Sequence, residues 1–398
     1  MTVTISKTDY RGTVVAPPSK SAAHRHLICA GLAEGTSVIR GISESEDMKA
    51  TLDCLAALGA TWTKNGDAVT VVGADPRKRR KATFPCRESG STLRFFIPLC
   101  LLSEKEAVMT GSDTLLHRPL GIYEEICLSQ GLVFDRAETG LMVAGPLDGG
   151  HFRVAGDISS QFISGLMFAL PLLSGYSVIE LIPPVMSASY LARTVEALRR
   201  FGITCEVTPD ERILLPGDQQ YRATDHTVEG DWSNAAFFLA LNALGSELEI
   251  EGLRRDTLQG DAVIRRLLGK LGRGCPTIDI ADCPDLAPIL MATAAALHGV
   301  TLVHTDRLKI KESDRGAAMA EELAKFGVPV TVGDDVITVE APTALKAPSV
   351  PICGHNDHRI VMACAVLLTR VGGVIEGAEA VNKSFPDFFD VLNTLEPF

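Results

Sequence analysis

Residues 319–332 read MAEELAKFGVPVTV, a helix-like stretch that ends at Gly327 and continues as a strand-like stretch. Similar stretches begin at Leu52 (LDCLAALGATWT), Glu124 (EEICLSQGLVF), Val195 (VEALRRFGITCEV), Ile264 (IRRLLGKLGRG) and Phe388 (FFDVLNTL). The sequence positions of the closing glycines Gly59, Gly131, Gly202, Gly272 and Gly327 differ by 72, 71, 70 and 55. Glycine adopts positive φ without Cβ strain, so each of these is predicted to end a helix in the left-handed conformation.

A second pattern, in which a small polar cluster leads into an apolar helix, is interleaved with the first. Its copies are SKSAAHRHLICAGLAEG, ESGSTLRFFIPLCLL, DISSQFISGLMFALPLL, GDWSNAAFFLALNALG, DCPDLAPILMATAAALHG and HNDHRIVMACAVLLTRVG. Measured between Ser21, Ser91, Ser160, Ser233, Asp285 and Asp357, the sequence positions differ by 70, 69, 73, 52 and 72. Both patterns shorten between their fourth and fifth copies. A unit of about 70 residues is therefore repeated six times, with a deletion near residues 273–284.

Each unit is predicted to alternate strands with helices. Strand segments rich in β-branched residues occur at 69–72, 177–181, 247–251 and 336–340. The helices of the second pattern are apolar nearly all round, which predicts burial, whereas those of the first carry one charged face and are predicted to face solvent. Three units around three buried helices make a compact domain, so we expect an α/β protein of two domains.

The composition is that of a globular protein, with 398 residues of which 46% are hydrophobic and 22% charged. The chain has 38 basic and 49 acidic residues, a net charge of −11, so no nucleic-acid partner is expected. The longest apolar run, residues 95–102, is shorter than the roughly 18 residues of a membrane span, and residues 1–10 do not resemble a leader. The ten cysteines include no C-x-x-C pair, which favours free thiols in the cytoplasm.

Cations occur at the predicted starts of the apolar helices. Lys20, Arg25, Arg94 and Arg359 fall within the polar clusters, beside residues suited to helix N-caps. Such clusters can be helix caps and nothing more. However, the free N–H groups of a helix start attract anions, and an unpaired buried cation is costly. Cations at several of the six aligned starts therefore favour an anion-binding site.

A second polar set recurs in the loops before the charged helices. It comprises Arg118 in HRPLG, Ser187 in MSASY, Lys311, Glu312 and Arg315 in KIKESDR, and Lys383 in NKSFPD. Alternating charges also occur on exposed helix faces, but recurrence at one place in the repeat favours a function. The basic run RKRRK at residues 77–81 lies between repeat elements and is expected to be a solvated linker.

The sequence contains no dinucleotide-binding, P-loop, nucleophile-elbow or H-E-x-x-H motif. His355, Asp357 and His358 could suggest a metal site, but no partner cluster occurs elsewhere, so a metal is not expected. Asp285 and Glu312 lie among the cations, where a pair of carboxylates suits general acid–base catalysis. From the residues alone we predict a transferase or binder that acts on phosphorylated acids.

Nine segments occur in an order that resembles the 5-enolpyruvylshikimate-3-phosphate synthases (3-phosphoshikimate 1-carboxyvinyltransferases). They are PPSKSAAHR, ESGSTLR, HRPLG, SSQFISG, EGDWSNAAFFL, PDLAPILMATAA, IKESDR, NDHRIVMA and KSFPDFF, and they extend over essentially the whole chain. The resemblance implies the enolpyruvyl transferase fold, with two domains of three βαβαββ units each around buried helices. The domains would be residues 17–226 and residues 1–16 with 227–398, and the active site would lie in the cleft between them. No cofactor or metal is implied, and a cytoplasmic monomer is expected.

The implied reaction transfers the enolpyruvyl group of phosphoenolpyruvate to the 5-hydroxyl of shikimate 3-phosphate through a tetrahedral intermediate. The resemblance makes Asp285 and Glu312 the proton-transfer pair, assisted by Lys20. By the same resemblance, shikimate 3-phosphate would contact Lys20, Ser21, Arg25, Ser159, Ser160, Gln161, Ser187, Asp285 and Lys311. Phosphoenolpyruvate would contact Lys20, Gly90, Arg118, Gln161, Arg315, Arg359 and Lys383.

Two departures from the family pattern leave contacts open. The segment RESGST replaces an Asn-Ala-Gly-Thr run, so contacts of Glu88 and Ser91 are not assigned. Arg307 stands where some members have an asparagine contact. Two alternatives also remain: the sister enolpyruvyl transferase that acts on UDP-N-acetylglucosamine, and a non-catalytic anion-binding relative.

Overall fold

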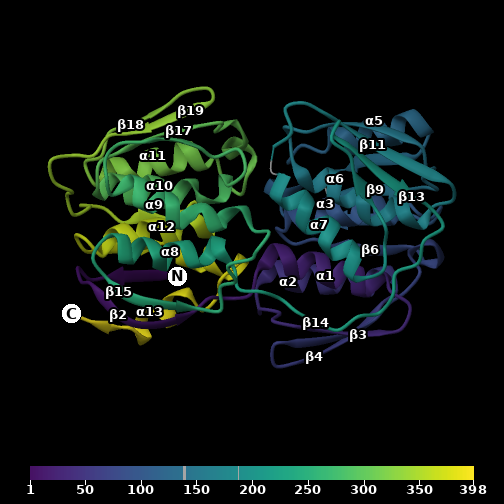
Figure 1. The fold of residues 1–398 in the computed structure, drawn as a ribbon, viewed down its shortest axis with the longest axis horizontal. Coiled ribbons are helices and arrows are strands. Elements are labelled where there is room, and N and C mark those ends of the chain that lie inside the picture. Colours follow the sequence, from purple (N-terminus) through teal and green to yellow (C-terminus); the bar gives the residue numbers. More distant parts are fainter. Residues whose placement is uncertain (138–139, 187) are drawn as a thin grey trace. The chain divides into compact units, whose positions relative to one another are not determined.

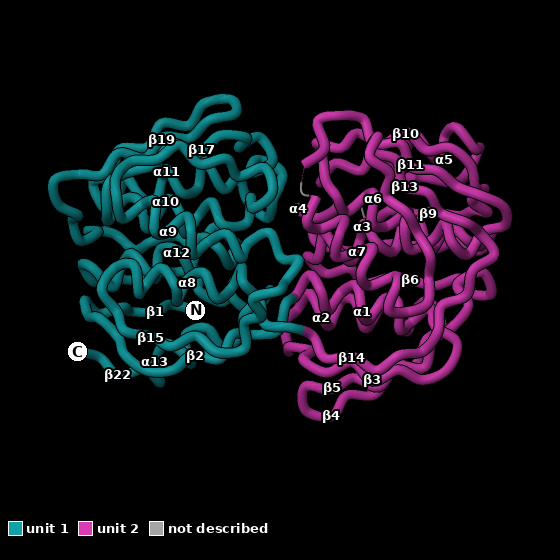
Figure 2. The backbone as a smooth tube through the Cα atoms, in the orientation of Figure 1, with its two compact units in different colours: residues 1–19, 229–398 teal, residues 20–228 magenta. Residues whose placement is uncertain are grey.

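The computed structural model describes residues 1–137, 140–186 and 188–398. The chain divides into two compact units (Figures 1 and 2). Unit 1 comprises residues 1–19 and 229–398, and unit 2 comprises residues 20–228. The chain therefore passes from one unit to the other after Ser19 and returns after Val228, whereas the expected boundaries followed residues 16 and 226.

Unit 2 contains three four-stranded sheets with one common topology. In each, the first two strands are parallel and the last two are antiparallel to their neighbours. The first sheet has the order β14 (His226–Thr227), β3 (Thr36–Arg40), β5 (Ala68–Val72), β4 (Thr61–Asn65). The second has the order β6 (Ala82–Pro85), β7 (Ala107–Thr110), β9 (Gly140–Ala144), β8 (Val133–Ala137). The third has the order β10 (His151–Ala155), β11 (Tyr176–Ile182), β13 (Arg212–Pro216), β12 (Glu206–Val207).

Unit 1 repeats this topology once and varies it twice. Its four-stranded sheet has the order β16 (Thr277–Asp279), β17 (Val300–Val303), β19 (Val336–Val339), β18 (Val330–Val332). One three-stranded sheet pairs β2 (Tyr10–Val15) with β15 (Glu247–Glu251) and β22 (Glu396–Pro397). The other pairs β21 (Gly373–Glu376) with β20 (Ile352–Cys353) and β1 (Thr2–Ile5). Strands from the two ends of the chain thus complete the two variant repeats.

The predicted deletion corresponds to a missing hairpin. In the complete repeats, two antiparallel strands follow the second helix. In the shortened repeat the chain passes from α9 (Ile264–Leu271) to β16, the first strand of the next sheet. The loss of two short strands and their turn accounts for the shortened interval in both sequence patterns.

Six helices fill the interiors of the two units, as their apolar sequences predicted. They are α1 (Lys20–Leu32), α3 (Gly90–Cys100) and α6 (Ser160–Ala169) in unit 2, and α8 (Trp232–Ala243), α10 (Ala287–Ala296) and α12 (His358–Leu368) in unit 1. Every residue of α12 is buried, and so are nine of the ten residues of α10. Each unit has its own hydrophobic core. Four of these helices, α3, α6, α10 and α12, connect two parallel strands of one sheet, so their N-termini follow the carboxyl ends of the first strands, where ligands of α/β proteins bind. The other two, α1 and α8, follow β2 and β14, at the points where the chain passes between the units.

A second set of helices buries one face. It comprises α2 (Glu46–Leu58), α5 (Gly121–Gln130), α7 (Ala188–Arg200), α9, α11 (Arg315–Lys325) and α13 (Phe388–Thr394). Four of the closing glycines, Gly59, Gly131, Gly202 and Gly327, have positive φ as predicted. The prediction is wrong for Gly272, whose φ is −68°; the helix ends there without a left-handed residue, and Gly274 has positive φ instead.

The basic run at residues 77–81 is not wholly the solvated linker that we expected. Arg79 is 4% exposed and donates to the carbonyl oxygens of Cys100 and Glu106, at 2.7 and 3.1 Å. Cys100 is the last residue of α3, and its carbonyl otherwise accepts only a long bond from the Ser103 amide at 3.4 Å, so Arg79 completes the hydrogen bonding of this helix end. Among the described residues, no helix is long and apolar enough to cross a membrane.

Candidate active site

Serine hydroxyls cap two of the buried helices in unit 2, at positions that the sequence singled out. Ser159 precedes α6, and its Oγ accepts a hydrogen bond from the backbone N–H of Gln161 at 3.3 Å. Ser89 precedes α3 and accepts from the Thr92 amide at 3.2 Å. The remaining N–H groups of these first turns stay available to an anion. Ser159 and Ser160 are 8% and 4% exposed, so a ligand that they bind would be largely desolvated.

Arg25 is buried on α1 without a carboxylate partner among the described residues. Its Nε donates to Thr194 Oγ1 and its Nη1 to the Ser21 carbonyl, both at 2.8 Å. Burial, reinforced by nearby Arg193, lowers the pKa of Arg25 to about 9. A guanidinium held by neutral oxygens in a dry environment retains an uncompensated charge, which an anionic ligand would neutralise.

Lys20, the first residue of α1, does have a carboxylate partner. Its Nζ lies 2.9 Å from Asp47 Oδ2 in the first turn of α2, and the two side chains are 14% and 11% exposed. No sequence pattern pointed to Asp47. Since its carboxylate accepts a hydrogen bond from the ammonium, Asp47 holds the Lys20 side chain in place at the start of α1.

Gly90 begins α3 directly against Arg118, which follows the short helix α4 (Asp113–Leu116). A Cβ atom on Gly90 would lie 2.5 Å from Arg118 Nη1 and 3.6 Å from Arg94 Nη1. The buried Nε of Arg118 has no hydrogen-bond partner in the described part of the chain. Glycine is therefore required for the guanidinium to lie against the helix start.

Gln161 is held from both ends of its amide. Its Oε1 accepts from Arg94 Nη1 at 2.8 Å, and its Nε2 donates to Ser91 Oγ at 2.8 Å. The structure thus gives Ser91, whose role the sequence left open, a partner within the protein. Arg94 was noted among the helix-start cations but was not assigned to a ligand; here it orients Gln161.

In unit 1, Arg315 connects three carboxylates. Its Nη1 donates to Asp285 Oδ1 at 2.8 Å, its Nε to Asp357 Oδ2 at 2.8 Å, and its Nη2 to Glu312 Oε2. Arg315 is 1% exposed. A fourth, longer bond from Nη2 reaches Asp357 Oδ1 at 3.4 Å, which leaves one of the five guanidinium donors for a ligand. The sequence did not show that Asp357, the N-cap of α12, is the third carboxylate.

Asp285 is surrounded by cations. It lies in the short helix η4 (Pro284–Leu286) before α10; Lys311 Nζ is 3.3 Å from its Oδ1, and Arg359 Nη2 is 3.3 Å from its Oδ2. Burial opposes ionisation, but Arg359, Lys311 and Arg315 hold the pKa of Asp285 well below its usual range. Burial also lowers the pKa of Lys311 to about 8. This cluster can therefore hold an anion and exchange protons near neutral pH.

Lys383 ends the short helix η6 (Ala378–Lys383) and is nearly buried. Its Nζ donates to the Asn356 carbonyl at 2.5 Å, just before α12. Arg359 itself is 5% exposed in the first turn of α12. The structure therefore brings Asp285, Lys311, Glu312, Arg315 and Arg359 together in unit 1. Ser187, a predicted phosphate contact, lies outside the described residues.

A further carboxyl group, which no sequence pattern marked clearly, lies close to this cluster. Asp261, in the short helix η3 (Gly260–Val263), is 5% exposed, and its Oδ1 has no hydrogen-bond partner among the described residues. Burial, together with the charge of Asp285, raises the pKa of Asp261 to about 6. Only the Q-G-D triplet after a strand could have drawn attention to it, and that is a weak signal.

The residues considered for a metal are used otherwise. Asp357 binds Arg315, and His355 Nε2 lies 2.8 Å from Glu322 Oε1. Glu321, Glu322 and His355 bring their ligand atoms within 4.8 Å of one another. However, Lys325 Nζ already contacts both Glu322 oxygens, at 2.9 and 2.8 Å, so the group is better described as an ion-pair network.

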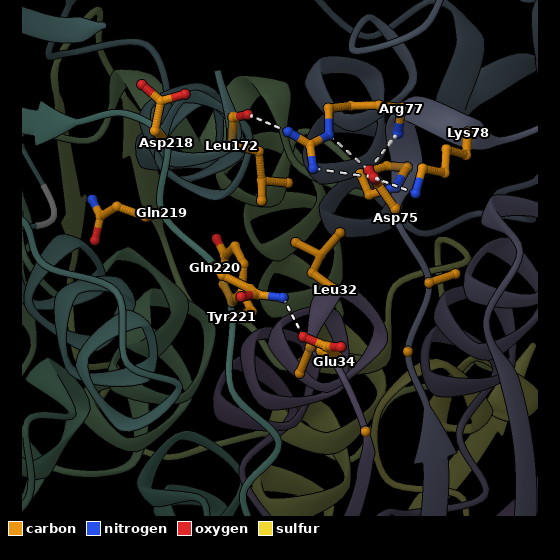
Figure 3. Close-up of a pocket in the computed structure, with 15 residues that line it drawn as sticks. Leu32, Glu34, Asp75, Arg77, Lys78, Leu172, Asp218, Gln219, Gln220 and Tyr221 are labelled. Atoms are coloured by element: carbon orange, nitrogen blue, oxygen red, sulfur yellow. Dashed lines mark hydrogen bonds and ion pairs between the residues drawn. The ribbon is translucent and has the colours of Figure 1, made fainter. Parts of the chain in front are cut away.

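Unit 2 also contains a pocket of about 550 Å³ at the opposite end of α1 from Lys20 (Figure 3). None of the predicted site residues lines it. Three carboxylates (Glu34, Asp75 and Asp218) and two cations (Arg77 and Lys78) line it instead, and Arg77 is bound by Asp75. Since the 13 residues of α1 span about 20 Å, this pocket is separate from the helix starts.

Comparisons with known proteins agree with this arrangement. Residues 5–392 match the family model of EPSP synthase (3-phosphoshikimate 1-carboxyvinyltransferase). The chain is 39% identical to the 3-phosphoshikimate 1-carboxyvinyltransferase of Clostridium kluyveri, over 99% of this chain and 97% of the relative. It is 38% identical to that of Clostridium novyi, over 97% and 95%. The solved structure of EPSP synthase from Acinetobacter baumannii is similar in fold, with a TM-score of 0.79, 23% identity, and coverage of 100% of this chain and 99% of that one. The predicted fold class is thereby confirmed.

Proposed function

This chain belongs to the EPSP synthase (3-phosphoshikimate 1-carboxyvinyltransferase) family, and we propose on that basis which of its residues hold each substrate and move each proton. The protein is an enzyme of the shikimate pathway that transfers the enolpyruvyl group of phosphoenolpyruvate to shikimate 3-phosphate and releases phosphate. The sister enzyme acting on UDP-N-acetylglucosamine and a non-catalytic relative are not favoured.

The observation that carries the proposal is the cluster of Asp285, Glu312 and Arg315 with Lys311 and Arg359. Three cations keep the Asp285 carboxylate ionised, as a proton acceptor must be, and Arg315 fixes the position of a second carboxylate beside it. Both features are what an addition–elimination reaction requires, because one proton leaves a hydroxyl and another is added to and removed from carbon.

We propose that Asp285 accepts the proton of the 5-hydroxyl as that oxygen bonds to C2 of phosphoenolpyruvate. Glu312, with Lys20, protonates the methylene carbon, which becomes a methyl group in the tetrahedral intermediate. Glu312, having given up its proton, then removes one methyl proton, and the double bond reforms as the C2–O bond to phosphate breaks and the phosphate leaves.

Substrate charge would tune the base. In the free enzyme Lys311, Arg359 and Arg315 depress the pKa of Asp285, which makes it a weak base. Phosphate and carboxylate groups bound to the same cations would offset their pull and raise that pKa towards the working range. The base would thus become effective only when both substrates are bound.

We further propose that shikimate 3-phosphate is bound by Ser21, Arg25, Ser159, Ser160, Gln161, Ser187, Asp285 and Lys311. A buried guanidinium and short hydroxyl donors suit a phosphate ester. Phosphoenolpyruvate would contact Gly90, Arg118, Gln161, Arg315, Arg359 and Lys383, and Lys20 would contact both substrates. These sets draw on both units. We also propose that the enzyme works as a cytoplasmic monomer, which light scattering would test.

The test is phosphate release with both substrates, with each omitted in turn, in the wild type and in Asp285→Asn and Glu312→Gln. We expect release to require both substrates and kcat to fall at least about 100-fold in each variant, while both substrates still bind by calorimetry. Asp306→Asn is the matched control, since this exposed carboxylate lies in the segment just before Glu312, and its Oδ1 is 2.9 Å from Lys309 Nζ. Full activity of Glu312→Gln would refute its role, and loss of binding together with kcat would make these carboxylates structural.

A further inference from the structure

Four buried polar side chains in unit 2 form a continuous hydrogen-bonded chain across three helices. His24 Nδ1 on α1 lies 2.7 Å from Thr51 Oγ1 on α2. Thr51 Oγ1 lies 2.9 Å from Thr92 Oγ1 on α3, which donates to Ser89 Oγ at 2.8 Å. The four residues are at most 1% exposed. The chain therefore runs from the helix of Lys20 to the start of the helix of Gly90, isolated from solvent.

Each hydroxyl group in the chain has one proton, so the direction of one bond fixes the others. Thr92 donates its proton to Ser89, which also accepts the Thr92 amide as the helix N-cap. Thr92 must then accept from Thr51, and Thr51 must accept from His24. The proton of the imidazole consequently lies on Nδ1.

This direction leaves the Ser89 hydroxyl with a proton to donate. It accepts two hydrogen bonds, and within the described residues it makes none as a donor. Ser89 directly precedes Gly90, where Arg118 lies against the helix start. In the opposite direction, Ser89 would donate inward to Thr92, and His24 would accept from Thr51.

We propose that His24 is a positioning residue for phosphoenolpyruvate: protonated on Nδ1, it sets the direction of the chain and keeps Ser89 as a hydrogen-bond donor at the start of α3. This inference rests on the proposed contact of phosphoenolpyruvate with Gly90 and Arg118. An anion at a helix start gains a further donor from a hydroxyl group that is held in one orientation.

The surroundings of His24 keep its ring neutral, as a fixed tautomer requires. Burial, and then the neighbouring charges of Lys20 and Arg25, hold the pKa of His24 well below its usual value. An imidazolium would donate from both nitrogens, whereas the buried Nε2 has no hydrogen-bond partner in the described part of the chain. The ring therefore acts through one donor.

The first experiment is ¹H–¹⁵N NMR of the ligand-free protein with labelled histidine. The protein has nine histidines, and the imidazole signal that is missing from the spectrum of His24→Asn belongs to His24. We expect protonation on Nδ1 and no titration between pH 5.5 and 8. Protonation on Nε2 would overturn the proposal whatever the substrate does.

The second experiment measures KM for each substrate separately. Ser89→Ala should raise KM for phosphoenolpyruvate about tenfold, the usual effect of losing a hydrogen bond to a charged group, and leave KM for shikimate 3-phosphate unchanged. His24→Leu should raise it about threefold or more, because Thr51 is then able to donate to a backbone carbonyl of its own helix and reverse the chain. His24→Asn, which retains an amide donor, should restore the wild-type value.

A double-mutant cycle separates positioning from stability. We expect His24→Leu to have no further effect on KM once Ser89 is alanine, although both changes lower Tm. His26→Leu is the matched control, because this buried histidine lies two residues further along α1 and takes no part in the hydrogen-bonded chain from His24 to Ser89. This variant should lower Tm without changing KM.

The outcomes distinguish this inference from the site on which it rests. If Gly90→Ala raises KM for phosphoenolpyruvate and Ser89→Ala does not, the role of Ser89 and His24 is refuted alone. If neither variant changes KM, phosphoenolpyruvate does not bind at this helix start, and both proposals fail.

Discussion

Gly90→Ala gives the most direct test of where phosphoenolpyruvate binds. The added Cβ would lie 2.5 Å from Arg118 Nη1. An ordinary contact needs about 3.4 Å, so the guanidinium must move by about 0.9 Å. The atom that must move is the far end of a flexible side chain, and Gly90 has no positive φ. The helix should therefore form normally, and alanine should favour it by up to about 1 kcal/mol.

The displaced guanidinium would lose its alignment with the ligand. A hydrogen bond between charged groups contributes about 1.5–3 kcal/mol, and about 1.4 kcal/mol corresponds to a factor of ten. We therefore expect KM for phosphoenolpyruvate to rise about 10- to 100-fold. KM for shikimate 3-phosphate should not change, and Tm should stay the same or rise.

The assay is steady-state phosphate release with each substrate varied in turn, combined with thermal unfolding. Gly121→Ala is the matched control: it is also a glycine at the first position of a helix, and its Cβ would contact nothing within 4 Å. An unchanged KM for phosphoenolpyruvate in Gly90→Ala would refute the placement. A large fall in Tm would show that the contact is not relieved by Arg118 alone.

The charges of unit 1 support three further predictions. Arg315→Met leaves buried carboxylates uncompensated and should cost about 3–5 kcal/mol of unfolding free energy in urea. The control is Arg212→Met, which removes an exposed ion pair with Asp210 and should not shift the urea midpoint. An equal shift in both variants would contradict the prediction. Because the pKa of Asp261 is raised to about 6, the folded protein binds more protons than the unfolded chain between pH 4 and 6, and the free energy of unfolding falls as pH rises through this range. Asp261→Asn should therefore gain up to about 3 kcal/mol of unfolding free energy relative to wild type across that range. If urea titrations show a difference between variant and wild type that does not change with pH, the pKa shift is excluded. Because burial lowers the pKa of Lys311 to about 8, kcat/KM for shikimate 3-phosphate should fall above pH 8 as the ammonium is lost. Lys311→Arg should move this alkaline fall of the pH profile to higher pH. If the fall does not move, it belongs to another group.

The repeat arithmetic predicted much of the fold because the buried helices impose a strong periodic signal. Six apolar helices, four of five testable glycine helix ends and the place of the deletion could all be located in this way. The completion of two sheets by β1 and β2 could not, because strands whose partners lie in the second half of the chain leave no local pattern. The prediction of a left-handed conformation at Gly272 failed for a related reason: no hairpin follows α9, so the chain need not reverse at that glycine.

The candidate site shows the same limit. Residue types and spacing identified the cations and the pair Asp285 and Glu312, whose common partner Arg315 is visible only in three dimensions. Pairing of Lys20 with Asp47, and the burial that raises the pKa of Asp261, depend on how helices pack. Sequence patterns report chemistry that is local, whereas the electrostatics of a site are set by neighbours from distant segments.

The pairing of β1 with β21 also bears on how the protein is made. Residues 2–5 leave the ribosome long before their partners, residues 373–376. At about 5–20 residues per second, synthesis of the intervening chain takes about 20–75 s. Unit 2 is synthesised entirely within that interval, so it can fold while the N-terminal strand is still exposed. The nascent chain would then carry an unpaired edge strand for most of its synthesis, and a chaperone that binds extended apolar segments would meet it there.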